Sequence, residues 1–137
     1  MYDVAIVMDD MRPRSLLVAE LEERGLRVCA WPTASEALRG LLTGEVEARV
    51  IVLDLGHGAG LSPEQALRVA LALDGRRLVV LMSAYGGERY ADARRIAFRT
   101  LVRPFRVGDV VRAVAAALGG APTSPQTSQT GTRSPAP

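Results

Sequence analysis

The sequence predicts an α/β protein with a doubly wound, five-stranded parallel sheet and five helices. Strands that are covered on both faces read as nearly continuous apolar runs. Three such runs predict the central strands, at Val4–Met8, Val50–Leu53 and Leu78–Met82. Helical patterns lie between them. Because strands and helices alternate along the chain, we expect parallel strands joined by right-handed crossovers, with helices on both faces of the sheet.

Weaker patterns complete the predicted elements. Two further strands are expected at Leu26–Trp31 and Thr100–Val102. The first helix carries Leu16, Leu17 and Leu21 at spacings that favour one common face, with Pro13 near its start and Gly25 at its end. The other helices are expected from the capping-box pattern Thr33–Glu36 to Leu42, and over Ser62–Leu73, Glu88–Ile96 and Val107–Leu118.

The length and composition indicate one domain followed by a tail. A chain of 137 residues suffices for one ordinary core. We expect the folded domain over residues 1–118 and a disordered Pro/Ser/Thr-rich segment over residues 119–137, since that segment has no large apolar side chain to bury. The segment is either a linker to a further domain or a native terminus, and the sequence leaves both open.

Charge and cysteine usage exclude several classes of function. The net charge is only +2, so we expect no direct binding of nucleic acid. All 17 basic residues are arginine, which indicates a bias of the whole chain. Cys29 has no cysteine partner in the chain, and no segment resembles a leader or a membrane span. These features predict a cytoplasmic protein that does not associate with membranes.

Polar residues follow four of the predicted strands. Asp9 and Asp10 come after the first strand, Asp54 after the third, Ser83 after the fourth and Arg103 after the fifth. Ligands of such sheets bind at the carboxyl ends of the strands, so we expect these side chains to gather there. Three close carboxylates require a cation, and their oxygen ligands suit Mg²⁺. Together with a hydroxyl and a guanidinium group, they favour phosphoryl transfer to an aspartate.

The order and spacing of these segments resemble the receiver domains of response regulators, over about residues 2–118. The resemblance implies a flavodoxin-like fold with strand order 2-1-3-4-5. The matching segments are Ile6–Asp10 followed by Leu16-Leu17, Ser35–Leu38, Val50–Asp54, Leu81–Gly86 and Val102–Phe105.

The resemblance also implies roles for individual residues. Asp54 would be the phosphoacceptor, supplied by a sensor histidine kinase or a phosphotransfer protein. Asp9, Asp10, Asp54 and the backbone carbonyl of Gly56 would hold Mg²⁺, while Ser83 and Arg103 would bind the phosphoryl group. A downstream protein target would bind the face made by the fourth helix, fifth strand and fifth helix, near Tyr85, Arg89, Tyr90, Arg106 and Val110. Such a domain is no enzyme beyond its own phosphotransfer and autodephosphorylation.

Three positions depart from the family pattern. Arg103 stands where the family has lysine, and its planar fork is no neutral replacement. Thr100 replaces a switching aromatic residue, and Phe98 is not an evident substitute. The glycine-rich segment Gly56–Gly60 replaces a Met-Pro turn, and His57 within it reads as a solvated loop residue.

These departures keep a second function open. The chain is either a phosphorylation switch or a pseudo-receiver that binds proteins without being phosphorylated. A free-standing phosphohydrolase is less favoured, because no additional acid/base residue or substrate-covering segment is evident in the sequence.

Overall fold

The computed structural model describes residues 1–55, 62–72, 77–83 and 89–119. Within them, the strands form one sheet of order β2-β1-β3-β4-β5, and all neighbouring pairs are parallel. The predicted fold class is confirmed, as is the strand order that the family resemblance implied. The strands are β1 (Tyr2–Val7), β2 (Val28–Trp31), β3 (Ala48–Asp54), β4 (Leu78–Met82) and β5 (Arg99–Val102).

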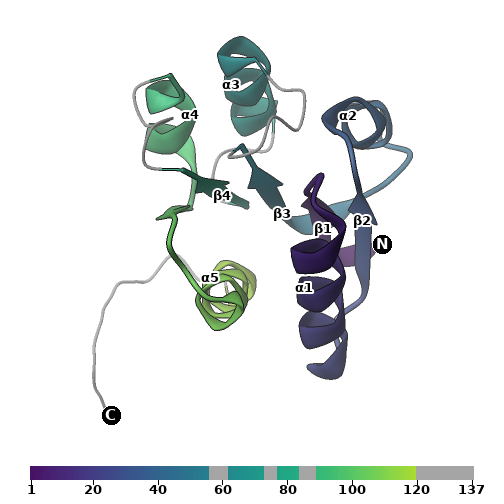
Figure 1. Ribbon diagram of the computed structural model, residues 1–137. Coiled ribbons are helices and arrows are strands. Elements are labelled where there is room, and N and C mark those ends of the chain that lie inside the picture. The colour runs from purple at the N-terminus through teal and green to yellow at the C-terminus, as the bar shows by residue number, and fades with distance from the viewer. Residues whose placement is uncertain (56–61, 73–76, 84–88, 120–137) are drawn as a thin grey trace.

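In the described parts of the chain, five helices cover the two faces of this sheet. Figure 1 shows α1 and α5 on one face and α2, α3 and α4 on the other. The doubly wound arrangement arises because the right-handed crossover from β1 to β2 runs in one direction along the sheet, and the crossovers from β2 onward run in the other. The helices are α1 (Met11–Glu23), α2 (Ala34–Thr43), α3 (Pro63–Ala72), α4 (Ala91–Ile96) and α5 (Val107–Gly119).

The core has two layers because alternate residues of each strand point to opposite faces. Ala5 and Val7 of β1 belong to the layer that α2 and α4 cover. Val4 and Ile6 belong to the layer beneath α1 and α5. All four side chains are buried, which explains why the strand reads as a continuous apolar run instead of an alternating one.

Local signals in the sequence fix several helix ends. Thr33 caps α2, and the backbone N–H of Glu36 donates to its Oγ1 at 3.4 Å, as the capping-box pattern predicted. Ser62 and Gln65 form a second reciprocal cap before α3, with bonds of 2.9 and 3.1 Å. After α1 the chain turns at Gly25, whose φ of +83° is the left-handed conformation that glycine adopts at little cost.

Two predictions about helices are corrected. Leu17 and Leu21 of α1 are buried, but Leu16 is 50% exposed, so the prediction that all three share one face is wrong. Residues one apart on a helix are rotated by about 100°, whereas a spacing of four brings side chains nearly into line. The fourth helix begins at Ala91, because Tyr90 has φ −111° and ψ 24° and therefore lies before the helix as its N-cap. Glu88, its expected start, lies outside the described residues.

The predicted end of the domain at residue 118 lies within the last turn of α5, which ends at Gly119. The predicted tail falls outside the described residues and stays a prediction. Cys29 on β2 is partly buried, and burial raises the pKa of its thiol above the ordinary value, as expected of an unreactive structural cysteine. In the part of the chain that the structure describes, none of the helices combines the length and apolarity needed to span a membrane.

Candidate functional site

Asp54 is the last residue of β3 and lies at the carboxyl edge of the sheet. In the sheet it is paired with Leu81 of β4, and the preceding residue, Leu53, is paired with Val7 of β1. The strand order reverses at β1, because β2 lies next to it on one side and β3 on the other. The carboxyl ends of β1 and β3 are therefore the topological switch point, where such folds bind ligands. Asp54 is 1% exposed, and among the described residues no other polar or charged residue is classed as buried.

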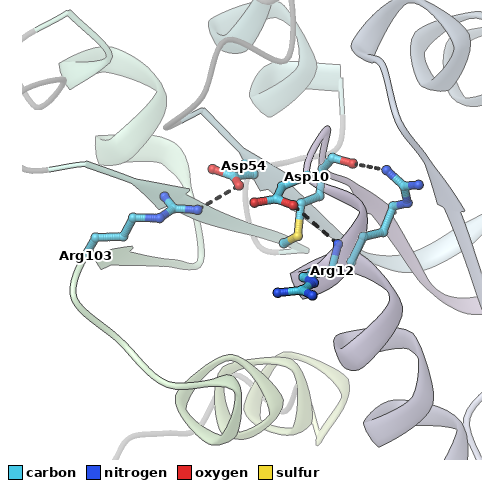
Figure 2. A network of polar contacts seen from close by, with 6 residues as sticks. Asp10, Arg12, Asp54 and Arg103 are labelled. Atoms are coloured by element: carbon cyan, nitrogen blue, oxygen red, sulfur yellow. Dashed lines mark hydrogen bonds and ion pairs between the residues drawn. The ribbon is translucent and has the colours of Figure 1, made fainter.

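Arg103 compensates the buried charge of Asp54. It follows β5, where its backbone N–H donates to the carbonyl of Met82 at 2.9 Å. Its Nη2 donates to Oδ2 of Asp54 at 2.8 Å, and its guanidinium group lies 5.0 Å from the centre of the Phe105 ring. Figure 2 shows the arginine side chain reaching across the edge of the sheet toward the carboxylate. A charge-assisted bond of this kind stabilises a carboxylate that water cannot reach.

One nitrogen of this guanidinium group is unused. Nη1 of Arg103 is buried and has no hydrogen-bond partner among the described residues. Buried donors are normally paired, and a donor left unpaired costs free energy. The unpaired N–H group therefore provides a place for an oxygen atom of a group attached to Asp54 or lying next to it.

The loop after β1 is held by its own side chains. Asp10 caps α1, and its Oδ1 accepts a hydrogen bond from the backbone N–H of Arg12 at 3.3 Å (Figure 2). Nη1 of Arg14 donates to the carbonyl of Met8 at 2.8 Å and lies 3.4 Å from that of Asp9. Both aspartates are exposed, so this loop presents two carboxylates to solvent.

A cavity of about 660 Å³ opens between the starts of α1 and α5. Its polar lining comes from Asp10, Ser83 and Arg103, which belong to three different loops of the same edge. The volume lies in the range of small-molecule sites. The apolar lining consists of Met8, Pro13, Leu17, Leu81, Pro104, Phe105, Val107 and Val110.

The structure thus brings together part of the predicted site. Asp10, Ser83 and Arg103 line one cavity, and Arg103 joins them to Asp54. Asp9 is exposed on the same loop but does not line this cavity, and Gly56 lies outside the described residues. Across the described ranges, no three His, Cys, Asp or Glu side chains are grouped so that they could hold a metal ion. Metal ligation by Asp9, Asp10, Asp54 and Gly56 therefore stays a prediction.

Several features of the site were not foreseen from the sequence. No sequence motif predicts the hydrogen bonds from Arg14 to the β1–α1 loop, since an arginine in the first turn of a helix is normally expected to be a surface residue. Thr100 was recognised as a departure, but its environment was not. Its Oγ1 is buried and lacks a partner within the described part of the chain, and its neighbour in the sheet is Val80.

No protein-family model matches the sequence, and no curated protein matches it. Solved structures do. A response regulator receiver domain protein from Clostridium thermocellum has a TM-score of 0.71 at 18% identity, covering 88% of this chain and 96% of its own. A CheY-like receiver domain protein from Methanospirillum hungatei has a TM-score of 0.69 at 18% identity, covering 86% of this chain and 94% of its own.

The fold is that of response regulator receiver domains. The same fold occurs under another description, since an adenylate cyclase structure from Rhodopirellula baltica has a TM-score of 0.71 at 19% identity, covering 86% of this chain and 87% of its own. At such low identity the likeness concerns the receiver fold alone. The chemistry must therefore be argued from the residues at the site.

Proposed function

We propose that the chain is a receiver domain of phosphorelay signal transduction, with Asp54 as the phosphoacceptor. The observation that carries the proposal is the placement of this aspartate. It is a carboxylate buried at the switch point of a receiver fold, and it forms an ion pair with a guanidinium group that has a spare donor within the described part of the chain. The donor would be a phosphohistidine of a sensor histidine kinase or of a phosphotransfer protein, and we expect both proteins in the cytoplasm.

In the transfer, a carboxylate oxygen of Asp54 would form a bond to phosphorus while the bond from phosphorus to the imidazole nitrogen breaks. The electron pair of the broken bond stays with that nitrogen. Arg103 would follow the new phosphoryl group and offer Nη1, which has no hydrogen-bond partner among the residues that the structure describes. The Ser83 hydroxyl, on the same cavity, would donate to another phosphoryl oxygen. The domain would catalyse no reaction beyond this transfer and the later hydrolysis of the phosphoaspartate, in which water takes the phosphoryl group as inorganic phosphate and the Asp54 carboxylate is restored.

The donor atoms at this edge suit Mg²⁺. Carboxylate oxygens are its preferred protein ligands, and it commonly binds through one or two carboxylates together with phosphate oxygens and water. Asp10 and Asp54 would supply such a pair, with Asp9 and the carbonyl of Gly56 as the further ligands that the family resemblance implies. When bound, the ion would neutralise the charge on the phosphoryl oxygens. Arg103 already engages Oδ2 of Asp54, so it would share that carboxylate with the metal.

The output surface proposed from the sequence, formed by α4, β5 and α5, needs one correction. Arg89 and Arg106 are exposed there, but Tyr90 and Val110 are buried in the core and do not offer their side chains to a partner. Tyr85 lies outside the described residues. A downstream protein that binds this surface would therefore contact mainly arginine side chains.

A pseudo-receiver is the second candidate, and two observations favour it. Arg103 already compensates the buried charge of Asp54 through a direct ion pair. Thr100 offers no aromatic side chain to report a change at the site, and its hydroxyl is already buried. In this alternative, the same face would bind a protein whether or not Asp54 is modified.

Intact-protein mass separates the two functions. After incubation with Mg²⁺ and acetyl phosphate, the wild-type chain should gain the mass of one phosphoryl group. The variant Asp54→Asn should gain none, because an amide is a far weaker nucleophile than a carboxylate. Asp92→Asn is a matched control, since it removes an exposed aspartate of α4 that lies away from the cavity and should leave the adduct unchanged.

If Asp54→Asn gains the same mass as the wild type, another residue is the acceptor and the proposed role of Asp54 is wrong. If neither acetyl phosphate nor phosphohistidine donors modify the wild-type chain, the pseudo-receiver is the better description.

A further inference from the structure

Charge is distributed unevenly along this chain. Residues 1–54 contain ten acidic residues and six arginines, a net charge of −4. Residues 55–137 contain five acidic residues and eleven arginines, a net charge of +6. The small net charge of the whole chain therefore conceals a basic half and an acidic half.

The basic excess is concentrated on one edge of the fold. β5 is an outer strand of the sheet, and Figure 1 shows α4 and α5 on opposite faces of that edge. Six exposed arginines lie on these elements and on the turns next to them, and we call them the arginine face. The arginine face consists of Arg89, Arg94, Arg95, Arg99, Arg106 and Arg112. Within residues 89–112 the only acidic residues are Asp92 and Asp109, so the excess of positive charge is at most four, and Glu64 of α3, which lines a small pocket with Arg89, offsets part of it.

Local contacts satisfy only part of this charge. Asp92 pairs with Arg95, and Asp109 pairs with Arg112. Arg89 and Arg99 lie over the rings of Tyr90 and Phe98, 5.7 and 5.4 Å from the ring centres. Stacking of this kind orients a guanidinium plane and leaves its N–H edge for bidentate acceptors.

We propose that the arginine face binds an acidic segment of a partner protein. The proposal names the chemistry of the downstream target, and its link to signalling rests on the proposed receiver function. Carboxylates match the fork of a guanidinium group, and arginine is enriched at protein interfaces. Val102 of β5, which is 40% exposed between these charges, adds an apolar contact that a protein segment can cover.

The number of charges favours a protein over a nucleic acid. Proteins that bind a duplex often do so through about six to ten phosphate contacts, and this binding weakens steeply as the salt concentration rises. At most four of the six arginines lie outside the ion pairs with Asp92 and Asp109, and residues 1–54 would repel an extended polyanion that ran past the boundary of the face. A short acidic segment of a protein can be bound by the few positive charges that the arginine face provides.

Fluorescence anisotropy with labelled probes tests the proposal. The probe is a twelve-residue peptide of alternating glutamate and leucine, compared with its glutamine counterpart and with a twelve-nucleotide oligothymidylate. The triple variant Arg89→Gln, Arg99→Gln, Arg106→Gln should weaken binding of the acidic peptide by about tenfold, since three exposed ion pairs are lost. Raising the salt concentration should weaken wild-type binding in the same direction.

A control with the same change in net charge is available. The triple variant Arg24→Gln, Arg27→Gln, Arg39→Gln removes three exposed arginines from the acidic half and should change affinity by less than about twofold. Equal losses in both triple variants would attribute binding to net charge alone and overturn the proposal. Tighter binding of the oligothymidylate, no binding of the acidic peptide, or salt-sensitive dimers of the chain that exclude the peptide would each overturn it too.

The test does not depend on phosphorylation. The unmodified wild-type chain and Asp54→Asn should both bind the acidic peptide. If they bind the peptide while no phosphoryl adduct forms, the proposed receiver chemistry is wrong and the proposed binding role of the arginine face is supported. If the adduct forms and the peptide does not bind, the reverse holds.

Discussion

Replacing Arg103 with leucine is expected to destabilise the fold by about 3 kcal/mol at neutral pH. The substitution leaves the Asp54 carboxylate, 1% exposed, without the guanidinium group that now lies 2.8 Å away. Removing one partner of a buried ion pair typically costs about 3–5 kcal/mol, because the other charge stays behind without compensation. We expect the lower end of that range, since the Arg103 side chain is 27% exposed and solvent screens part of the interaction. Urea unfolding at constant pH measures the change.

A double-mutant cycle assigns this loss to the ion pair. Asp54→Asn alone removes the buried charge and should cost less than Arg103→Leu. In the double variant, Arg103→Leu should add about 1 kcal/mol or less to the cost of Asp54→Asn, because no charge is then left unpaired. An equally large effect of Arg103→Leu in both backgrounds would show that the arginine stabilises the fold through packing on Phe105 and not through Asp54.

Leu17→Ala is expected to lower the free energy of unfolding by about 3 kcal/mol, whereas Leu16→Ala should change it by about 0.5 kcal/mol or less. The two residues are neighbours on α1, but Leu17 is 2% exposed and Leu16 is 50% exposed. Leu17 packs in the layer with Val4, Ile6 and Leu21, and its truncation leaves a void that the rigid sheet cannot close. Thermal and urea unfolding of the two variants provide the measurement.

The pair also tests the rotation of α1 about its axis. Both substitutions replace leucine with alanine in the same helix, so the difference in helix propensity cancels. If Leu16→Ala were the more destabilising of the two, α1 would be turned by about 100° from the orientation described here.

The sequence predicts the sheet because strands buried on both faces require nearly continuous runs of apolar residues. The β1 and β4 segments are apolar at almost every position, and turn or cap residues separate them from the helices. Thr33 and Gly25 mark helix ends through their own backbone preferences, so local reasoning locates them well. The strand order is different. It came from the likeness to receiver domains, since the periodicity of isolated strands says nothing about their neighbours.

The site was foreseen in its residue types but not in its contacts. The carboxylate, hydroxyl and guanidinium groups could be placed at one edge because parallel strands end together. Which carboxylate is buried depends on tertiary packing, and so does the choice of Asp54 as the partner of Arg103. The hydrogen bond from Arg14 to the β1–α1 loop and the exposure of Leu16 also depend on tertiary packing. These facts depend on side-chain directions that spacing alone does not give.

If Asp10 and the reactive Asp54 share one cation, as we propose, a Mg²⁺ titration followed by calorimetry will detect it. We predict saturable binding to the wild-type chain and a loss of about tenfold in affinity, or about 1.4 kcal/mol, in both Asp10→Asn and Asp54→Asn. Glu22→Gln, at the far end of α1, should bind as the wild type does. Equal Mg²⁺ affinity in all four proteins, or no binding by the wild type, would contradict the account.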